Sequence, residues 1–455
     1  MELSLEIVTL IALIFLVIYS IKIWHWRCFL SPGFYFGFIW TFGVLGARIF
    51  LEYGFLEILA EKYIIELNSF VLFTAVCFIF FTWRSRKKIN RNSIVGINLL
   101  DSLLWFKILS CIVLLIAIYT FINAGASFDM GASRDAMHDN VKNQSVFTGY
   151  GQALAIPLSI IGGSLFGKVL LKQVKLSWIN KLFLFIPLLA NLLFSIYLGG
   201  RVNFVYGFIQ YGIGFCLNLK INQGFAVSKR IFKMAFIALI VLSTFISIVA
   251  AQRQQHQLGK TIKYDTIARQ GTLYAIFYGP MEYMTSTYLG YQYRRIDAVD
   301  EEDLTYGTRT FNGFINWSLP FASRFGLQDF TIADAFDVRY DNQETYDFKR
   351  KFFYVTHSCY IPLVKDFGPT GTYFAIIFLT WIANYLFVKI QKRKTIRWAS
   401  SIFLYYIFLE YWLKSNYYGT LSGSIIVTLY GLLIFDLINY ISRKSYNTTT
   451  FTKLK

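Results

Sequence analysis

Residues 64–91 read IIELNSFVLFTAVCFIFFTWRSRKKINR, an apolar run that is followed directly by a cluster of basic residues. A helix needs about 20 mainly apolar residues to cross a hydrocarbon layer of roughly 30 Å, and residues 64–83 have that length and composition. The basic residues that follow are Arg84, Arg86, Lys87, Lys88 and Arg91. This pattern is typical of a membrane span that ends on the cytoplasmic side.

Apolar runs of similar length recur along the whole chain. Hydrophobic residues make up 56% of the sequence and charged residues only 15%, which excludes a soluble globular protein. We therefore predict an all-α polytopic membrane protein with about 11 transmembrane helices. The predicted spans are residues 5–23, 33–51, 64–83, 103–122, 150–171, 179–199, 202–219, 231–251, 368–388, 397–415 and 421–441.

The basic residues indicate how these spans are oriented. More than half of the 44 basic residues lie in six alternate connections, and cytoplasmic connections are enriched in Lys and Arg. This places the N-terminus outside and the C-terminus in the cytoplasm. The span at 202–219 is the least apolar, but without it the next basic segment would lie on the wrong side. The six segments contain Lys22 and Arg27; Arg84, Arg86, Lys87, Lys88 and Arg91; Lys168, Lys172, Lys175 and Lys181; Lys220, Lys229, Arg230 and Lys233; Lys389, Lys392, Arg393, Lys394 and Arg397; and Arg443, Lys444, Lys453 and Lys455.

The formal net charge of +18 follows from this orientation, so it does not indicate a nucleic-acid partner. The five cysteines form no disulfide framework, and no Cys/His spacing suits a metal ion. We therefore expect no metal and no cofactor.

Three regions follow from this topology: residues 1–251 with the first eight spans, residues 252–366 on the outer side, and residues 367–455 with the last three spans and a cytoplasmic tail. The external region contains 13 basic and 14 acidic residues and many aromatic ones. Its aromatic stretches are typical of amphipathic or re-entrant helices, which suit a lid over a cavity that opens toward the membrane. A passive surface loop is the alternative.

Four basic residues on the predicted outer side are candidates for binding an anion. They run against the charge bias that orients the protein, and a lipid-linked diphosphate is an anion found at this depth. Arg201 is the strongest of them, because it follows two glycines in a very short connection between two spans. Each could instead extend to an ordinary lipid phosphate. The four are Arg201, Arg253, Arg324 and Lys365.

His357 lies shortly before the ninth span, where an imidazole could act as a base toward a hydroxyl group. It could equally be a polar residue near the membrane interface. Asp334, Asp337 and Asp341 belong to an acidic run whose spacing suits one face of a helix, and glycan binding and metal binding are alternatives to a solvated face. Glu410 is a carboxylate within a predicted span, and it is a candidate for function or for a structural pair with Lys414.

The chain resembles the Wzy-type O-antigen polymerases, which are integral-membrane polymerases of oligosaccharide repeat units. The resemblance rests on the many spans with one large external loop late in the chain, on the Gly199-Gly200-Arg201 turn, and on the stretch from Thr356-His357-Ser358 to Asp366-Phe367-Gly368-Pro369-Thr370-Gly371. Members of this family have a His-Asn pair where this chain has His357-Ser358.

The resemblance implies a metal-independent, GT-C-like glycosyltransferase in the bacterial inner membrane, with its active site facing the periplasm or exterior. Such an enzyme transfers a growing glycan from undecaprenyl diphosphate to the next lipid-linked repeat unit. His357 and Arg201 would be catalytic, and Arg201, Arg253, Arg324 and Lys365 would bind the diphosphate. The implied partners are the lipid-linked donor and acceptor, membrane lipids and a chain-length regulator. An O-antigen-ligase-like transferase and a flippase or transporter remain alternatives, and the sugars, linkage and oligomeric state are left open.

Overall fold

The computed structural model describes residues 2–52, 61–87, 103–123, 146–197, 202–219 and 358–392, with isolated residues between 229 and 310. In these residues the regular structure is entirely helical and contains no strand. The chain divides into two compact units that are not sequential. Unit 1 combines the first part of the chain with a segment from residue 281 onward, and unit 2 contains most of what lies between.

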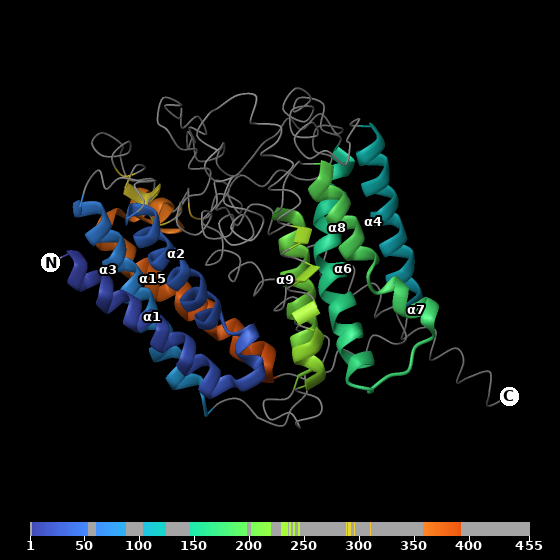
Figure 1. Ribbon diagram of the computed structural model, residues 1–455, viewed down its shortest axis with the longest axis horizontal. Helices are drawn as coiled ribbons and strands as arrows, with labels where there is room; N and C mark the ends of the chain where they lie inside the picture. The colour runs from blue at the N-terminus through green and yellow to red at the C-terminus, as the bar shows by residue number, and fades with distance from the viewer. Residues whose placement is uncertain are drawn as a thin grey trace, which may run out of the picture. The chain divides into compact units, whose positions relative to one another are not determined.

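In the continuous stretches of unit 1 that the structure describes, the chain forms four long helices and one short one (Figure 1). The turn that ends the first helix is made by His25, whose φ of 46° lies in the left-handed region. Pro32 occupies the first position of the next helix, where its missing N–H leaves no hydrogen bond unmade. The elements are α1 (Glu2–Trp24), η1 (His25–Leu30), α2 (Pro32–Glu52), α3 (Glu61–Ser85) and α15 (Tyr360–Lys392).

Helices α1 and α3 run in the same direction, and α2 runs the opposite way. At the start of α1, Thr9 contacts the carbonyl oxygen of Asn68 on α3. The guanidinium of Arg48, late in α2, donates to the carboxylate of Glu6, early in α1, with an Nε–Oε1 distance of 2.7 Å. Three consecutive helices of unit 1 thus alternate in direction, as the predicted spans require.

Helix α15 joins this group from far along the sequence and runs parallel to α1 and α3. Asn384, late in α15, donates to the hydroxyl of Ser85 at the end of α3 over 2.7 Å. Arg27, which is buried just after α1, donates from Nη1 to Gln391 Oε1 at 2.7 Å. If α3 and α15 both cross the membrane, an odd number of crossings lies between them. The five spans predicted there agree with that condition.

Unit 2 is a second helical bundle, in which helices that follow one another along the chain, such as α6 and α8, alternate in direction (Figure 1). Gly151 at the start of α6 lies against Phe194 of α8, whereas Gly162 lies against Leu184, which precedes α8. These contacts make α6 and α8 antiparallel. The elements are α4 (Leu103–Asn123), α6 (Val146–Leu170), α7 (Trp178–Phe183), α8 (Ile186–Tyr197) and α9 (Val202–Cys216).

In unit 2, the described helices α6 and α9 run parallel, and their backbones approach each other closely. A methyl group added at Gly163 would lie 1.9 Å from the carbonyl oxygen of Tyr211, and one added at Gly214 would lie 1.9 Å from that of Ile160. Small residues allow this backbone contact, which is a common way for helices to associate in lipid. The amide of Asn218 adds a hydrogen bond to the Ser164 carbonyl oxygen at 2.8 Å.

Five described helical stretches are long and apolar enough to cross a membrane. They confirm an all-helical protein with several helices suited to a membrane, while the number of 11 spans and their sidedness stay predictions. The least apolar predicted span, 202–219, forms the helix α9, and Phe204–Cys216 is one of two shorter apolar helices, with Leu154–Leu170. The five long stretches are Ser4–Leu30, Glu61–Ser85, Leu103–Asn123, Trp178–Tyr197 and Tyr360–Gln391.

Two predicted spans differ in detail from the helices that form. The span predicted at 179–199 is divided into α7 and α8 by a turn at Leu184 and Phe185. The span predicted at 368–388 is part of a longer helix that begins at Tyr360. The eighth span is described only in part, and the last two spans lie outside the described residues.

Candidate functional site

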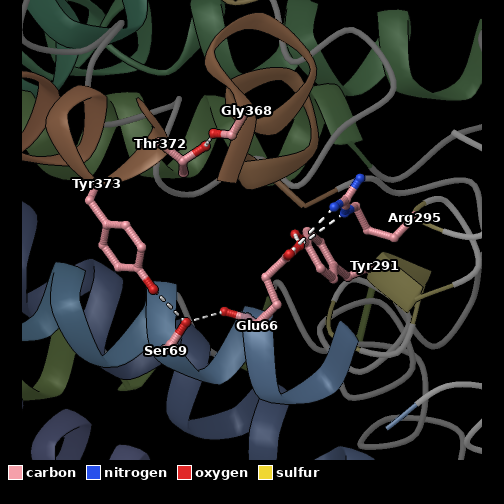
Figure 2. A network of polar contacts seen from close by, with 7 residues as sticks. All are labelled: Glu66, Ser69, Tyr291, Arg295, Gly368, Thr372 and Tyr373. Atoms are coloured by element: carbon pink, nitrogen blue, oxygen red, sulfur yellow. Dashed lines mark hydrogen bonds and ion pairs between the residues drawn. The ribbon is translucent and has the colours of Figure 1, made fainter. Parts of the chain in front are cut away.

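The helix that follows the predicted external region is broken at Gly368. Gly368 has φ 69° and ψ 173°, a conformation that is essentially restricted to glycine. Pro369 then begins the second part of α15, because its fixed φ suits the first turn of a helix. The Thr372 hydroxyl donates to the Gly368 carbonyl oxygen at 2.7 Å, so the carbonyl group at the break has a hydrogen-bond partner (Figure 2).

One residue beyond Thr372, the side chain of Tyr373 points from α15 toward α3 (Figure 2). Its hydroxyl lies 2.8 Å from the hydroxyl of Ser69, which in turn donates to the Glu66 carbonyl oxygen at 2.6 Å. Because Ser69 has only one hydroxyl hydrogen, Tyr373 is the donor of the contact between them. The Tyr373 ring packs edge-on against Phe70 and Phe73, with centroid distances of 5.0 Å to each.

The carboxylate of Glu66 is held by two residues from the predicted external region. Arg295 donates to it from Nε at 2.9 Å and from Nη2 at 3.4 Å, and the Tyr291 hydroxyl donates to Oε1 (Figure 2). The side chains of Arg295 and Glu66 retain 15% and 20% of their exposure. The Arg295 guanidinium also lies 5.2 Å from the centre of the Tyr63 ring, which adds a cation–π contact.

The spacing of Tyr288, Tyr291 and Arg295 places them on one face of a helix. All three side chains contact residues at the start of α3. The Asn68 side-chain amide donates to the Tyr288 hydroxyl at 2.7 Å. We call these residues and their partners the α3 polar cluster. It consists of Tyr63, Glu66, Asn68, Ser69, Tyr288, Tyr291, Arg295 and Tyr373.

Burial and charge make the hydroxyl of Tyr291 a permanent donor. Burial raises the pKa of Tyr291 well above its usual value of about 10, and the charge of Glu66 and the hydrogen bond to it raise the pKa further. Burial alone would lower the pKa of Arg295, but the hydrogen bond to the Glu66 carboxylate and the charge of that carboxylate raise it overall. Both donors therefore keep their protons at neutral pH.

The short helical segment before the break contains a second polar contact. Asp366 is fully buried, and its Oδ2 accepts the backbone N–H of Thr310 at 2.6 Å. Lys365 precedes it and remains partly exposed. The first part of α15, which lies at the end of the predicted external region, is thus in contact with an earlier residue of that region, and Lys365 lies three residues before the break.

The chain matches no family model, no curated protein and no solved structure.

The arrangement suits the binding of a polar ligand. The α3 polar cluster supplies a guanidinium paired with a carboxylate, hydroxyl groups and aromatic rings, a combination typical of sites that bind glycan hydroxyls. Within the part of the chain that the structure describes, no group of three or more His, Cys, Asp or Glu residues is placed to hold a metal ion.

Of the catalytic and binding residues predicted from the sequence, only Lys365 lies in the described part of the chain. Those that lie outside the described residues are His357, Arg201, Arg253, Arg324, Asp334, Asp337, Asp341 and Glu410.

The sequence reasoning missed the α3 polar cluster, although one signal for it was present. Glu66, Asn68 and Ser69 form a polar run inside an apolar span, and an ionisable residue at such a place is a candidate for function. The spacing of Tyr288, Tyr291 and Arg295 is a weaker signal, because it indicates a helical face without indicating the partner of that face.

Proposed function

We propose that the protein is a membrane glycosyltransferase that polymerises lipid-linked oligosaccharide repeat units. The observation that carries the proposal is the break at Gly368, which falls in the stretch that resembles the Wzy-type polymerases. Tyr373, which lies five residues beyond the break, belongs to the α3 polar cluster through its contact with Ser69. A non-helical residue at membrane depth suits a site that is lined by protein or opens to water.

In the proposed reaction, the growing glycan leaves undecaprenyl diphosphate and is joined to a hydroxyl group of the next lipid-linked repeat unit. A diphosphate is already a good leaving group, so the enzyme has to stabilise its developing negative charge and orient the acceptor. Guanidinium groups provide the first function, because their planar fork can bind two phosphate oxygens. A base provides the second.

The proposed roles of individual residues follow from this chemistry. Arg201 binds the diphosphate, with Arg253, Arg324 and Lys365 as further cations, and His357 accepts the proton of the acceptor hydroxyl. Asp334, Asp337, Asp341 and Glu410 bind hydroxyl groups of the glycan.

The proposed location is the bacterial inner membrane, with the site on its periplasmic or external side. Lipid-linked donor and acceptor, membrane lipids and a chain-length regulator are the proposed partners. Neither a metal ion nor a cofactor takes part in the proposed reaction.

The decisive test is polymerisation of a purified lipid-diphosphate repeat unit by the reconstituted protein. Arg201→Ala should lower turnover by roughly 30-fold to 1,000-fold, the effect of losing a principal stabiliser of negative charge. Arg201→Lys should be nearly as impaired, because an ammonium group cannot form the bidentate contact. Arg84→Lys, the same replacement on the predicted cytoplasmic side, is the matched control and should retain activity.

His357→Ala should also stop chain growth, while the protein elutes normally from a size-exclusion column. If wild-type protein joins no repeat units, the proposed function is wrong. Transfer only to a different glycolipid acceptor would indicate a ligase. Movement of the lipid-linked unit across the membrane without bond formation would indicate a transporter.

A further inference from the structure

The C-terminal half of α3 carries a row of exposed aromatic residues that ends in a cation. Phe80 and Trp83 are 47% and 51% exposed, and their ring centres lie 6.2 Å apart. One turn further on, the guanidinium of Arg86 lies 5.6 Å from the centre of the Trp83 ring. An exposed apolar side chain, an exposed tryptophan and a cation therefore follow one another along this side of the helix.

Helix α15 carries a second row of the same kind. Phe378, Trp381 and Tyr385 are all exposed, and the rings of Trp381 and Tyr385 are stacked with centres 5.8 Å apart. The ammonium group of Lys389 lies 5.7 Å from the centre of the Tyr385 ring. Again the order along the helix is apolar ring, amphipathic ring and cation.

Both rows end at the same end of unit 1. Helices α3 and α15 run parallel, and Asn384 donates to the carbonyl oxygen of Phe81 at 3.3 Å and to the hydroxyl of Ser85 at 2.7 Å. The sequence contains no carboxylate from residue 67 to 100 or from 367 to 409. The charge at the ends of these two helices is therefore entirely positive along both stretches.

A phospholipid matches this order of groups. Apolar rings along a helix contact acyl chains, tryptophan and tyrosine favour the boundary between hydrocarbon and water, and cations beyond them attract phosphate. A guanidinium or ammonium group that rests on a ring is held near the boundary and still has N–H donors for an anion. An anion dissolved in water has no acyl chain, so its binding would not require the exposed rings that precede each cation along its helix.

We propose that Arg86 with Trp83, and Lys389 with Tyr385, form two binding sites for the phosphate groups of anionic phospholipids. In the predicted orientation these sites face the cytoplasmic leaflet, where anionic lipids attract basic residues. The inference does not depend on the proposed glycosyltransferase activity, since it concerns the other end of the two helices from the α3 polar cluster.

The test is native mass spectrometry of the purified full-length protein during titration with phosphatidylglycerol. Wild type should retain up to two phosphatidylglycerol molecules under conditions that remove phosphatidylcholine. Arg86→Gln and Lys389→Gln should each weaken one of these binding events by about fivefold, the effect of one basic residue at an anionic surface. Trp83→Leu and Tyr385→Leu should each weaken binding by a smaller factor, because the cation remains but loses its ring.

Lys175→Gln and Lys181→Gln are the matched controls. Both lysines are exposed on unit 2 and lie in a predicted cytoplasmic segment, and neither takes part in the cation–π contacts of the described residues. They should leave phosphatidylglycerol binding unchanged. The proposal is overturned if the controls weaken binding as much as Arg86→Gln and Lys389→Gln, or if those two variants and the ring variants bind as wild type does. It is also overturned if millimolar inorganic phosphate displaces the lipid, or if lipid retention occurs only in a dimer.

Discussion

Arg295 donates two hydrogen bonds to the carboxylate of Glu66, from Nε at 2.9 Å and from Nη2 at 3.4 Å, although 229 positions separate the two residues in the sequence. The contact joins the predicted external region to the first turns of α3. Charged hydrogen bonds are directional, so this pair fixes the orientation of the Arg295 guanidinium as well as its position. The α3 polar cluster therefore joins residues of α3 to residues far along the sequence.

Removal of either member of this pair should destabilise the folded protein. We expect Glu66→Gln and Arg295→Gln each to lower the free energy of unfolding by about 1 to 2 kcal/mol, since the pair is partly exposed to solvent. In the double variant the two losses should not add, and the coupling energy should be about 1 kcal/mol. Thermal unfolding in detergent measures these values. Full additivity of the two single effects would mean that the residues do not interact in the folded protein.

The contribution of Tyr291 should depend on pH only under strongly alkaline conditions. Its pKa is raised in the folded protein, so its stabilising effect is complete below the unfolded pKa of about 10 and is lost as the pH rises above that value. The difference in melting temperature between wild type and Tyr291→Phe should be constant from about pH 6 to 9 and should shrink above about pH 10. A difference that changes between about pH 6 and 8 would contradict this assignment.

Gly368→Ala should destabilise the protein, because alanine strongly disfavours the backbone conformation at this break. The expected cost is about 1 to 3 kcal/mol. Thr370→Ala, two residues further and exposed, is the control and should change the stability by less than about 0.5 kcal/mol. Equal melting temperatures for Gly368→Ala and wild type would show that the break relaxes into a continuous helix.

Gly214→Ala should separate α6 from α9, because the added methyl group would overlap the carbonyl oxygen of Ile160. We expect a loss of about 1 to 3 kcal/mol, the usual cost of overpacking a well-packed interface. Gly212→Ala on the same helix is the control, since no atom lies within 4 Å of the position of its added methyl group. Size-exclusion behaviour and thermal unfolding of the two variants can be compared directly. A Gly212→Ala variant that is as unstable as Gly214→Ala would point to helix flexibility instead of close packing.

The predicted orientation can be tested at the two ends of one helix. Lys62 and Lys87 are exposed and lie at opposite ends of α3. Cysteine at position 62 should react with a membrane-impermeant maleimide added to intact cells, and cysteine at position 87 should react only after the cells are opened. The reverse pattern would invert the orientation and place the α3 polar cluster on the cytoplasmic side.

The sequence by itself determined that the protein is helical and where most of the described helices form. Apolar runs such as 64–83 and 103–122 are long enough to span a membrane, and the helices Glu61–Ser85 and Leu103–Asn123 form where these runs lie. A helix in lipid has to satisfy its backbone hydrogen bonds internally, so its location is encoded in the local run of residues. The alternation of basic segments likewise predicted helices of alternating direction.

Only the tertiary structure decided which helices become neighbours. Helix α15 packs with α1, α2 and α3, and α6 is paired with α9, although nothing in the apolar composition of these segments distinguishes their partners. A leucine or phenylalanine side chain gains almost no free energy when it moves from lipid to the surface of another helix. Association of apolar helices in lipid therefore depends on shape, on small residues and on a few hydrogen bonds. Glu66, Tyr291 and Arg295 therefore meet through contacts that no local pattern in the sequence contains.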